Sequence, residues 1–254
     1  MANIAERQKL ILERLRQQGF VKVSDLSREL NASEVTIRKD LKFFEEKKLL
    51  QRSHGSASAL TSIISDRHID VKEKMQTEEK IRIAKAANKL LEPNDKIIIA
   101  SGTTLLAFAS AIDIHAQITV ITSSVRVSLT LCYNPYIEIV QLGGIIRKNS
   151  VSVIGHYAEN MLETLSCNKL FIGVDGIDPD YGLTTSDMNE AHINRQMIAA
   201  AQKIIVLTDS SKFDKRGFCK ICSLDNIHHI ITDTNAPAHI IKVIRERNIE
   251  VTLV

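Results

Sequence analysis

The sequence predicts a small, mainly helical domain followed by a larger α/β domain with a doubly wound, mainly parallel sheet. Three observations lead to this prediction. Residues 1–57 contain three amphipathic stretches and a short hairpin pattern around Gly55. From residue 77 onward, short apolar runs alternate with helical stretches, which is typical of βαβ units. Several runs are apolar throughout, as expected for strands whose two faces are both covered. We expect domains at 1–57 and 77–254, with a linker at 58–76.

The first domain is expected to contain three helices and a hairpin. The first helix spans residues 5–18, and the second covers the stretch VSDLSRELN with Ser24 as its N-cap. The third helix begins after Ser33, a second N-cap candidate. Two short extended pieces around Gly55 follow it. Three helices and a small hairpin make a winged helix-turn-helix.

The third helix has one apolar and one basic face. At 100° per residue, Ile37, Leu41 and Phe44 form a buried stripe. The opposite, exposed face suits the major groove of DNA, because Lys and Arg meet phosphates and guanine edges while a small apolar residue meets a thymine methyl. A solvated charged face is the alternative. The candidate DNA-binding residues of the helix, its cap and the wing are Ser33, Val35, Thr36, Arg38, Lys39, Lys42, Arg52 and His54.

The charge distribution agrees with a DNA-binding first domain. Residues 1–60 carry 12 Lys and Arg against 8 Asp and Glu, a net charge of +4, whereas residues 61–254 carry 21 against 22, a net charge of −1. The N-terminus lacks the apolar core of a signal peptide, and no apolar run is long enough to span a membrane. We therefore expect a cytoplasmic protein.

The second domain opens with an amphipathic helix from Thr77, and strand candidates follow. These are residues 96–100, 118–122, 137–142, 169–175, 203–208, 228–232 and 250–254. The first strand candidate runs directly into Ser101-Gly102-Thr103-Thr104 and a small-residue helix. A glycine turn, hydroxyl groups and the free N–H groups of a helix start together make an anion site. An ordinary helix cap is the alternative.

Polar and glycine residues also follow the next four strand candidates. In open α/β sheets, ligands bind at the carboxyl ends of the strands. A polyhydroxylated anion such as a sugar phosphate matches these groups, with Asp175 and Asp178 holding hydroxyls and Lys212 a phosphate or carbonyl. The candidate effector-binding residues are Ser101, Gly102, Thr103, Thr104, Ser123, Gly144, Arg147, Asp175, Gly176 and Lys212.

Over nearly its full length the sequence resembles the DeoR family of bacterial transcriptional regulators. The resemblance lies in the stretches ERQKLILERL, VKVSDLSREL, SEVTIRKDL, QRSHGSAS, EEKIRIAKAA, SGTT, LGGIIR, FIGVDGID, YGLTT and LTDSSKF. It implies a DNA-binding repressor whose second domain, similar to ribose-5-phosphate isomerase, binds a phosphorylated sugar and thereby modulates operator binding. Three positions depart from the family pattern. Ala100 stands where many members have Asp, Ser56 replaces a wing glycine, and Ser123 or Ser124 replaces a sensor Asn.

The alternative function is a sugar-phosphate isomerase with an accessory DNA-binding head. Isomerisation needs a carboxylate base and a nearby cation. Asp175 and Asp178 supply carboxylates, but residues 179–194 contain no Lys or Arg. We therefore expect a regulator rather than an enzyme, with double-stranded operator DNA and a sugar phosphate as partners and no cofactor. One helix and one wing bind DNA weakly, so a homo-oligomer, dimer or tetramer, is expected.

The cysteines are not expected to bind metal. Cys219 and Cys222 have CxxC spacing, but residues i and i+3 of a strand point to opposite faces, which opposes chelation. We interpret both as small core residues. Cys132 and Cys167 are expected to be buried thiols.

Overall fold

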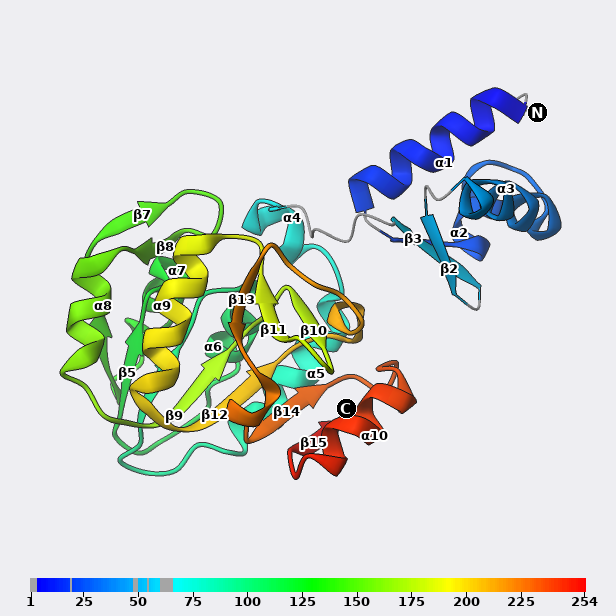
Figure 1. The fold of residues 1–254 in the computed structure, drawn as a ribbon. Helices are drawn as coiled ribbons and strands as arrows, with labels where there is room; N and C mark the ends of the chain where they lie inside the picture. Colours follow the sequence, from blue (N-terminus) through cyan, green and yellow to red (C-terminus); the bar gives the residue numbers. More distant parts are fainter. Residues whose placement is uncertain (1–3, 19, 48–49, 54, 60–65) are drawn as a thin grey trace. The chain divides into compact units, whose positions relative to one another are not determined.

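The computed structural model describes residues 4–18, 20–47, 50–53, 55–59 and 66–254. The chain divides into two compact units, which we call the N-terminal unit (Met1–Ser65) and the C-terminal unit (Asp66–Val254) (Figure 1). The division lies within the linker expected at residues 58–76. The C-terminal unit therefore begins earlier in the chain than expected.

The N-terminal unit has the three predicted helices and the predicted hairpin. Its elements are α1 (Ile4–Gln18), β1 (Phe20–Lys22), α2 (Val23–Glu29), α3 (Glu34–Glu46), β2 (Leu50–Ser53) and β3 (Ser56–Ala59). β2 and β3 pair antiparallel and form the predicted hairpin. β3 also pairs antiparallel with β1, a strand that the sequence did not predict. The sheet order is therefore β1–β3–β2.

A separate hydrophobic core holds the N-terminal unit together. The predicted stripe of α3 is confirmed, since Ile37, Leu41 and Phe44 are all buried there with α1 and α2 residues. The N-cap predicted at Ser24 is wrong. α2 begins at Val23, so Ser24 lies inside its first turn, and Lys22 takes the cap position without a side-chain hydrogen bond.

The C-terminal unit is built on a seven-stranded sheet in the order β15–β14–β12–β9–β4–β5–β6, and every neighbouring pair is parallel. Its strands are β4 (Lys96–Ile99), β5 (Ile118–Thr122), β6 (Ile137–Gln141), β9 (Cys167–Ile172), β12 (Ala201–Leu207), β14 (His229–Thr232) and β15 (Glu250–Leu253). They correspond to the seven predicted strands. The parallel sheet is thus confirmed.

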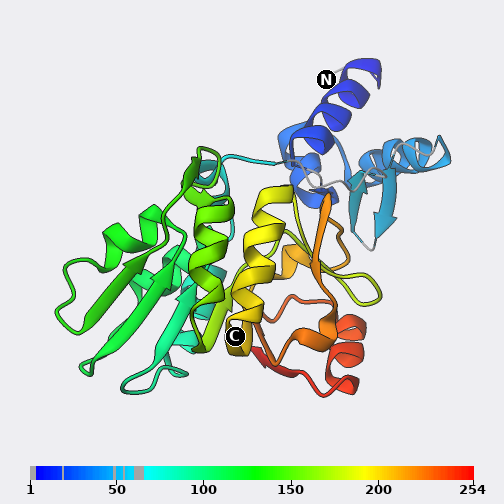
Figure 2. The same cartoon turned by 60° about the vertical axis from the view of Figure 1, so that its left-hand side comes forward.

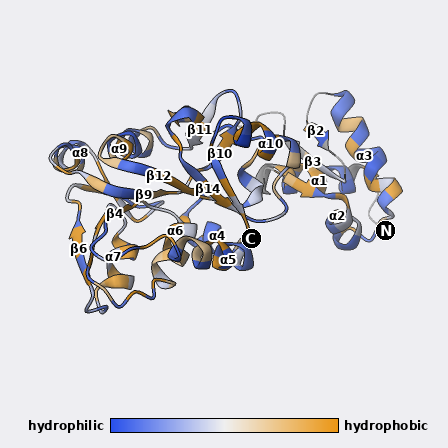
Figure 3. Ribbon diagram, turned by 90° about the horizontal axis from the view of Figure 1, so that it is seen from below, coloured by the Kyte–Doolittle hydropathy of each residue, from blue (hydrophilic) through white to orange (hydrophobic). Residues whose placement is uncertain are grey.

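Helices cover both faces of this sheet. One face carries α5 (Thr77–Asn88), α6 (Thr103–Ser110) and α7 (Val125–Leu131), and the other carries α8 (His156–Glu163), α9 (Met188–Ala199) and α10 (Ala238–Glu246). Figure 3 shows the apolar strands between the two helical layers, and Figure 2 shows α8 and α9 side by side. Each layer buries its own apolar cluster, which confirms the doubly wound architecture. In the α5–α6–α7 layer, the rings of Phe108 and Phe171 lie 4.4 Å apart.

The order of the strands identifies where a ligand can bind. From β4 the chain proceeds to β5 and β6 on one side, and then from β9 to β12, β14 and β15 on the other. The direction of strand addition therefore reverses between β4 and β9. In open α/β sheets, ligands bind at the carboxyl ends of the strands that flank such a switch point.

Several short antiparallel strands were not predicted. They are β7 (Ile145–Arg147), β8 (Ser152–Ile154), β10 (Gly176–Asp178), β11 (Gly182–Thr185) and β13 (Cys219–Cys222). Cys219 and Cys222 lie in β13, partly buried against the core. Cys167 is buried as expected, but Cys132 follows α7 and is exposed, so its predicted burial is wrong.

The expected linker is folded in its second half. Residues Ile69–Glu73 form helix α4, which packs against α6. Ile69 is buried, and its N–H donates to the Asn149 carbonyl at 2.8 Å. The chain before α5 is therefore part of the C-terminal unit. In the part of the chain that the structure describes, no helix has both the length and the apolar character required to cross a membrane.

Candidate functional site

Helix α3 presents the basic face that the sequence predicted. Ser33 caps the helix, accepting a hydrogen bond from the Thr36 N–H at 3.2 Å, and the two hydroxyl oxygens lie 2.9 Å apart. Val35 is 60% exposed, so its side chain is accessible to a partner on this face. Arg38, Lys39 and Lys42 are exposed on the same helix.

The cations of this face are held only by weak surface ion pairs. Arg38 pairs with Glu34 at 2.7 Å, Lys42 with Glu46 at 3.9 Å, and Arg52 with Glu45 at 3.6 Å. The side chains of all three ion pairs are exposed or half-exposed. Such pairs contribute at most about 1 kcal/mol each, so phosphates can displace the acidic partners. Within the described residues, Lys39 makes no ion pair. His54 lies outside the residues that the structure describes.

The turn after β4 leaves the start of α6 open. Gly102 takes the N-cap position with φ 138°, a conformation that favours glycine, and no side chain caps the helix. The N–H groups of the first helical turn therefore lack intrahelical partners. The loop after β9 closely approaches this turn, since a Cβ on Gly173 would lie 2.7 Å from a Leu105 methyl and 3.7 Å from the Ser101 carbonyl oxygen. The predicted anion site thus lies at the switch point.

Asp175, at the carboxyl end of β9, is buried and fully engaged. It accepts hydrogen bonds from Lys72 Nζ at 2.8 Å, from the Ser186 N–H at 3.0 Å and hydroxyl at 2.8 Å, and from the Thr185 hydroxyl at 3.3 Å. Burial raises the pKa of this carboxyl, but the charges of Lys72 and Lys212 and these hydrogen bonds outweigh it. The pKa is therefore held well below its usual range. Lys72 comes from the expected linker and was not predicted.

Arg147 lies on β7 among three carboxylates. It pairs with Asp66, with Asp187 at 3.2 Å and with Glu190 at 3.3 Å. Asp66 also accepts a hydrogen bond from the Ser186 hydroxyl at 3.3 Å, which connects Arg147 to the surroundings of Asp175. The guanidinium is therefore occupied in this structure. An effector can contact it only by replacing one of these carboxylates.

Four lysines gather near the carboxyl ends of β9 and β12. Lys212 lies on the short helix η1 (Ser210–Lys212), and its charge acts on Asp175, Lys80 and Lys215. Burial, together with the charge of Lys212 and against the opposing charge of Asp209, lowers the pKa of Lys80 to about 8. Burial and the same neighbour lower the pKa of Lys215 to about 8. The fourth, Lys72, contacts Asp175.

Four further predicted effector residues, Thr104, Ser123, Gly144 and Gly176, lie in packed positions. Thr104 and Ser123 are buried, and the Ser123 carbonyl accepts the Val153 N–H at 2.8 Å. Gly144, with φ 147°, leaves no room for a Cβ, which would lie 2.8 Å from the Ile154 carbonyl oxygen. A Cβ on Gly176 would lie 2.4 Å from the Lys215 carbonyl oxygen. These contacts explain the two glycines without a ligand.

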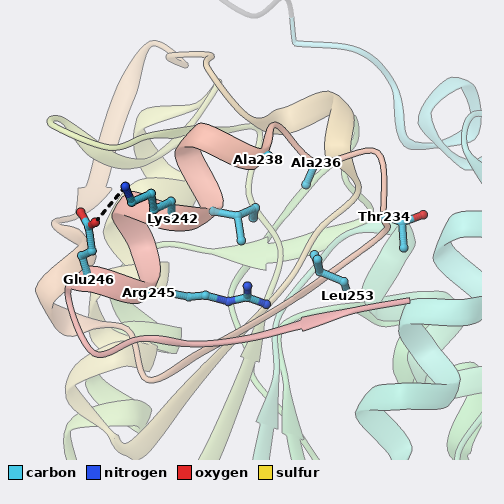
Figure 4. A pocket seen from close by; sticks show the side chains of 8 residues that line it. Thr234, Ala236, Ala238, Lys242, Arg245, Glu246 and Leu253 are labelled. Carbon is cyan, nitrogen blue, oxygen red and sulfur yellow. Dashed lines mark ion pairs between the residues drawn. The ribbon is translucent and has the colours of Figure 1, made fainter.

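A separate pocket lies between α10 and the edge strand β15 and shares no residue with the predicted site (Figure 4). It is lined by Thr234, Ala236, Ala238, Ile241, Lys242, Arg245, Glu246 and Leu253. Lys242 and Glu246 pair at 3.8 Å, and Arg245 donates to the Val251 carbonyl at 3.4 Å. Both cations therefore already have partners. No group of three or more His, Cys, Asp or Glu side chains in the described part of the chain could hold a metal ion.

Comparison with known families gives two matches that together cover both units. The DeoR-like helix-turn-helix domain matches residues 7–63, and the DeoR C-terminal sensor domain matches residues 75–234. The second match alone covers more than half of the chain.

Known proteins resemble the chain over nearly its whole length. A putative aga operon transcriptional repressor from Escherichia coli is 37% identical over 98% of this chain and 94% of its own. The glycerol-3-phosphate regulon repressor from Escherichia coli is 28% identical, covering 98% of both chains. Among solved structures, ribose 5-phosphate isomerase A from Methanocaldococcus jannaschii gives a TM-score of 0.41 at 18% identity, covering 54% of each chain.

Proposed function

Because the chain belongs to the DeoR family of transcriptional regulators, we propose that it represses a carbohydrate-use operon and that a phosphorylated sugar modulates its operator binding. The relatives named above are a putative aga operon repressor and a glycerol-3-phosphate regulon repressor, which supports this proposal. The C-terminal unit is the sensor unit in this proposal, and the N-terminal unit binds the operator. The protein then acts in the cytoplasm, where the operator DNA lies.

One observation carries the effector part of the proposal. The uncapped start of α6 lies at the switch point between β4 and β9. Helix N-termini attract anions through free N–H groups and the helix dipole. Lys212 supplies a nearby cation, and the Thr103 hydroxyl a further donor. A phosphate monoester fits this combination, and polar groups around Asp175 suit the hydroxyls of a sugar.

Operator binding is assigned to the exposed face of α3. A single helix and wing give few base contacts, so two copies bound to paired half-sites are required for a specific operator. We therefore include a homo-oligomer in the proposal. The effector regulates only if its binding and DNA binding are energetically coupled, and this coupling is reciprocal. A typical coupling of about 1–3 kcal/mol changes operator affinity roughly 5- to 150-fold.

The test compares operator Kd with and without phosphorylated sugars in three variants. Thr103→Ala removes a hydroxyl donor and Lys212→Ala a cation, whereas Lys85→Ala removes an exposed cation of α5 as a matched control. We expect all three to bind the operator like the unmodified protein. Only Thr103→Ala and Lys212→Ala should lose the change in operator Kd that the sugar phosphate causes. An unaltered response in both rejects the start of α6 as the effector site.

An isomerase with an accessory DNA-binding head is the second candidate. The observation in its favour is the buried carboxylate of Asp175 with the Lys72 cation 2.8 Å away. The low pKa of Asp175 argues against it, because a general base is most effective when its pKa is close to the working pH. We therefore favour a regulator without catalytic activity.

A further inference from the structure

We propose that the open edge of β7 pairs antiparallel with the same edge of a second copy of this chain, with a two-fold axis at Ile146. The two β7–β8 ribbons then form one four-stranded sheet, in the order β8–β7–β7–β8. This inference rests on the homo-oligomer included in the proposed function and names the surface that forms it.

The backbone of Ile146 faces the open edge of the ribbon. β7 and β8 are antiparallel, and Ile146 lies opposite Val153. The Val153 N–H donates to the Ser123 carbonyl at 2.8 Å, so the backbone polar groups of Val153 point away from β7. Residue pairs in an antiparallel ladder alternate between bonded and non-bonded, and both groups of a non-bonded pair point outward. The N–H and C=O of Ile146 therefore point away from β8.

No strand covers this edge in the part of the chain that the structure describes. β7 is the outer strand of its two-stranded sheet and lies outside β8 (Figure 1). An unpaired strand edge is a template for another strand, and proteins usually protect it with charges, proline or a covering segment. An antiparallel edge is also its own complement. Two copies related by a two-fold axis exchange the Ile146 N–H and C=O reciprocally, which closes the contact at a dimer.

The side chains at this edge are apolar and exposed. Ile145 is 68% and Ile146 55% exposed, although both are large and adjacent in the chain. An Ile145 methyl lies 4.0 Å from the position of a Cβ on Gly155, the N-cap of α8, so this end of β7 lies beside the start of α8. Tyr157, in the first turn of that helix, is exposed as well. Contiguous apolar groups of this kind mark interaction sites, and pairing the two copies removes them from water.

The charges beside β7 are compatible with this pairing and select its register. An axis at Ile146 sets Ile145 opposite Arg147 of the other copy, and Gly144 opposite Lys148. Arg147 is neutralised by its carboxylate partners, and the exposed Lys148 faces a glycine without charge. An axis at Arg147 or Lys148 would instead set a cation opposite its own copy, and like charges directly opposite are destabilising.

The far end of β7 holds the segment with which the sensor unit begins. Arg147, the residue after Ile146, pairs with Asp66. The Asn149 side-chain amide donates to Asp66 at 2.6 Å, and the Asn149 carbonyl accepts the Ile69 N–H at 2.8 Å. Pairing at Ile146 therefore brings Asp66 of both copies near the two-fold axis. DNA-binding units tethered at neighbouring points suit adjacent half-sites, which lie about 34 Å apart.

The first experiment measures the mass of the full chain by analytical ultracentrifugation over a range of concentrations, without DNA. Ile146→Lys places two cations against each other at the axis. Leu129→Lys is the matched control, because Leu129 is an apolar residue of α7 that is 64% exposed. Circular dichroism and the unfolding temperature show whether each variant is folded.

We expect the unmodified protein and Leu129→Lys to sediment as a dimer or a larger even-numbered assembly. Ile146→Lys should be folded, with half of that mass at the same concentration and a dissociation constant at least about 30-fold higher, as for a central interface residue. A monomeric unmodified protein overturns the inference. An assembly that Ile146→Lys does not weaken also overturns it.

The second experiment tests the register by disulfide cross-linking with diamide as the oxidant. Cys132, which is exposed, is first replaced by Ser. In that background Ile146→Cys should form a covalent dimer, because the two Cα atoms of a bonded antiparallel pair lie about 5.5 Å apart, within disulfide reach. Ile145→Cys should not, since its copy is offset by two residues, about 6.8 Å along the strand, and lies beyond that reach.

Leu129→Cys in the same background controls for random collisions. Absence of a covalent dimer in Ile146→Cys overturns the inference. Equal cross-linking of Ile145→Cys or Leu129→Cys overturns it too, because the contact would then not be centred on Ile146.

The proposed function is tested separately, by operator binding and its response to phosphorylated sugars. If the protein is an oligomer that Ile146→Lys leaves intact, the inference fails, while a repressor assembled through another surface stands. If Ile146→Lys halves the mass and Ile146→Cys cross-links, but no phosphorylated sugar changes operator affinity, the inference stands and the proposed function fails.

Discussion

Lys72 Nζ lies 2.8 Å from Asp175 Oδ1, although the two residues are 103 positions apart in the chain. The pair joins α4 to the carboxyl end of β9, and the Asp175 side chain is only 9% exposed. Removing one member of such a pair leaves a buried charge without its partner. The contact therefore holds α4 against the carboxyl end of β9, and its loss should affect the stability of the sensor unit.

Lys72→Met should destabilise the sensor unit by about 3–5 kcal/mol, because it leaves the Asp175 carboxylate buried and unpaired. Adding Asp175→Asn should restore most of this loss, since the uncompensated charge is then gone. Urea unfolding of both variants and of Asp175→Asn alone completes a double-mutant cycle. Additive losses in the double variant would show that the two side chains do not interact in solution.

Lys39→Ala and Arg38→Ala should each weaken operator binding by about 1–3 kcal/mol without changing the unfolding temperature. The reason is that both side chains are exposed on α3 and are not part of its core. If the lost contact is to a phosphate, the salt dependence of log Kd should decrease by about one. Lys85→Ala, on the sensor unit, is the control and should bind like the unmodified protein. Unchanged operator affinity in both α3 variants would show that this face of α3 does not contact the operator.

The stability of the protein should depend on pH through Lys80. The folded pKa of Lys80 lies below its ordinary value of 10.5, so the folded state binds fewer protons than the unfolded state between about pH 8 and 10.5. This group therefore makes the protein more stable as the pH rises through that window. Urea unfolding between pH 7 and pH 10 should show this rise in the unmodified protein and not in Lys80→Met. An equal rise in both would contradict the assignment to Lys80.

The purified protein should show no aldose–ketose isomerase turnover on pentose or hexose phosphates. Asp175 is the candidate base, and its pKa lies well below the usual range because Lys72 and Lys212 outweigh the effect of burial. So weak a base abstracts a carbon-bound proton poorly. Product formation is followed by chromatography over many hours, with Asp175→Asn alongside. Sustained turnover that disappears in Asp175→Asn would show that the protein is an isomerase. It would also reject the proposal of a regulator without catalytic activity.

The larger features of the fold could be predicted from the sequence because they depend on local patterns. Strands covered on both faces appear as apolar runs, and all seven strands of the main sheet were recognised this way. The stripe of Ile37, Leu41 and Phe44 followed from helical periodicity alone. The strands that were missed, β7, β8, β10, β11 and β13, lie in or beside polar, glycine-containing stretches that the sequence analysis interpreted as loops after the main strands.

The site was less predictable because its chemistry depends on contacts between distant residues. Nothing near Lys72 in the sequence indicates Asp175, and the weak periodicity of residues 58–76 favoured a linker. Arg147 was a candidate effector-binding residue in the sequence, but folding surrounds it with three carboxylates. Ser24 resembled a cap because Ser is favoured there, yet α2 begins one residue earlier.

The reversal of strand order between β4 and β9 has a consequence for how the sensor unit assembles. β4, β5 and β6 follow one another in the main sheet, so they can pair through short crossovers. β9 pairs with the other edge of β4, although β5 and β6 lie between β4 and β9 in the chain. Pairing across such a separation slows folding. We expect a refolding intermediate in which one edge of β4 is still open, and open strand edges promote aggregation. The carboxyl ends of β4 and β9 meet only when β9 has docked, so a ligand that requires both ends stabilises the docked state and not its precursors.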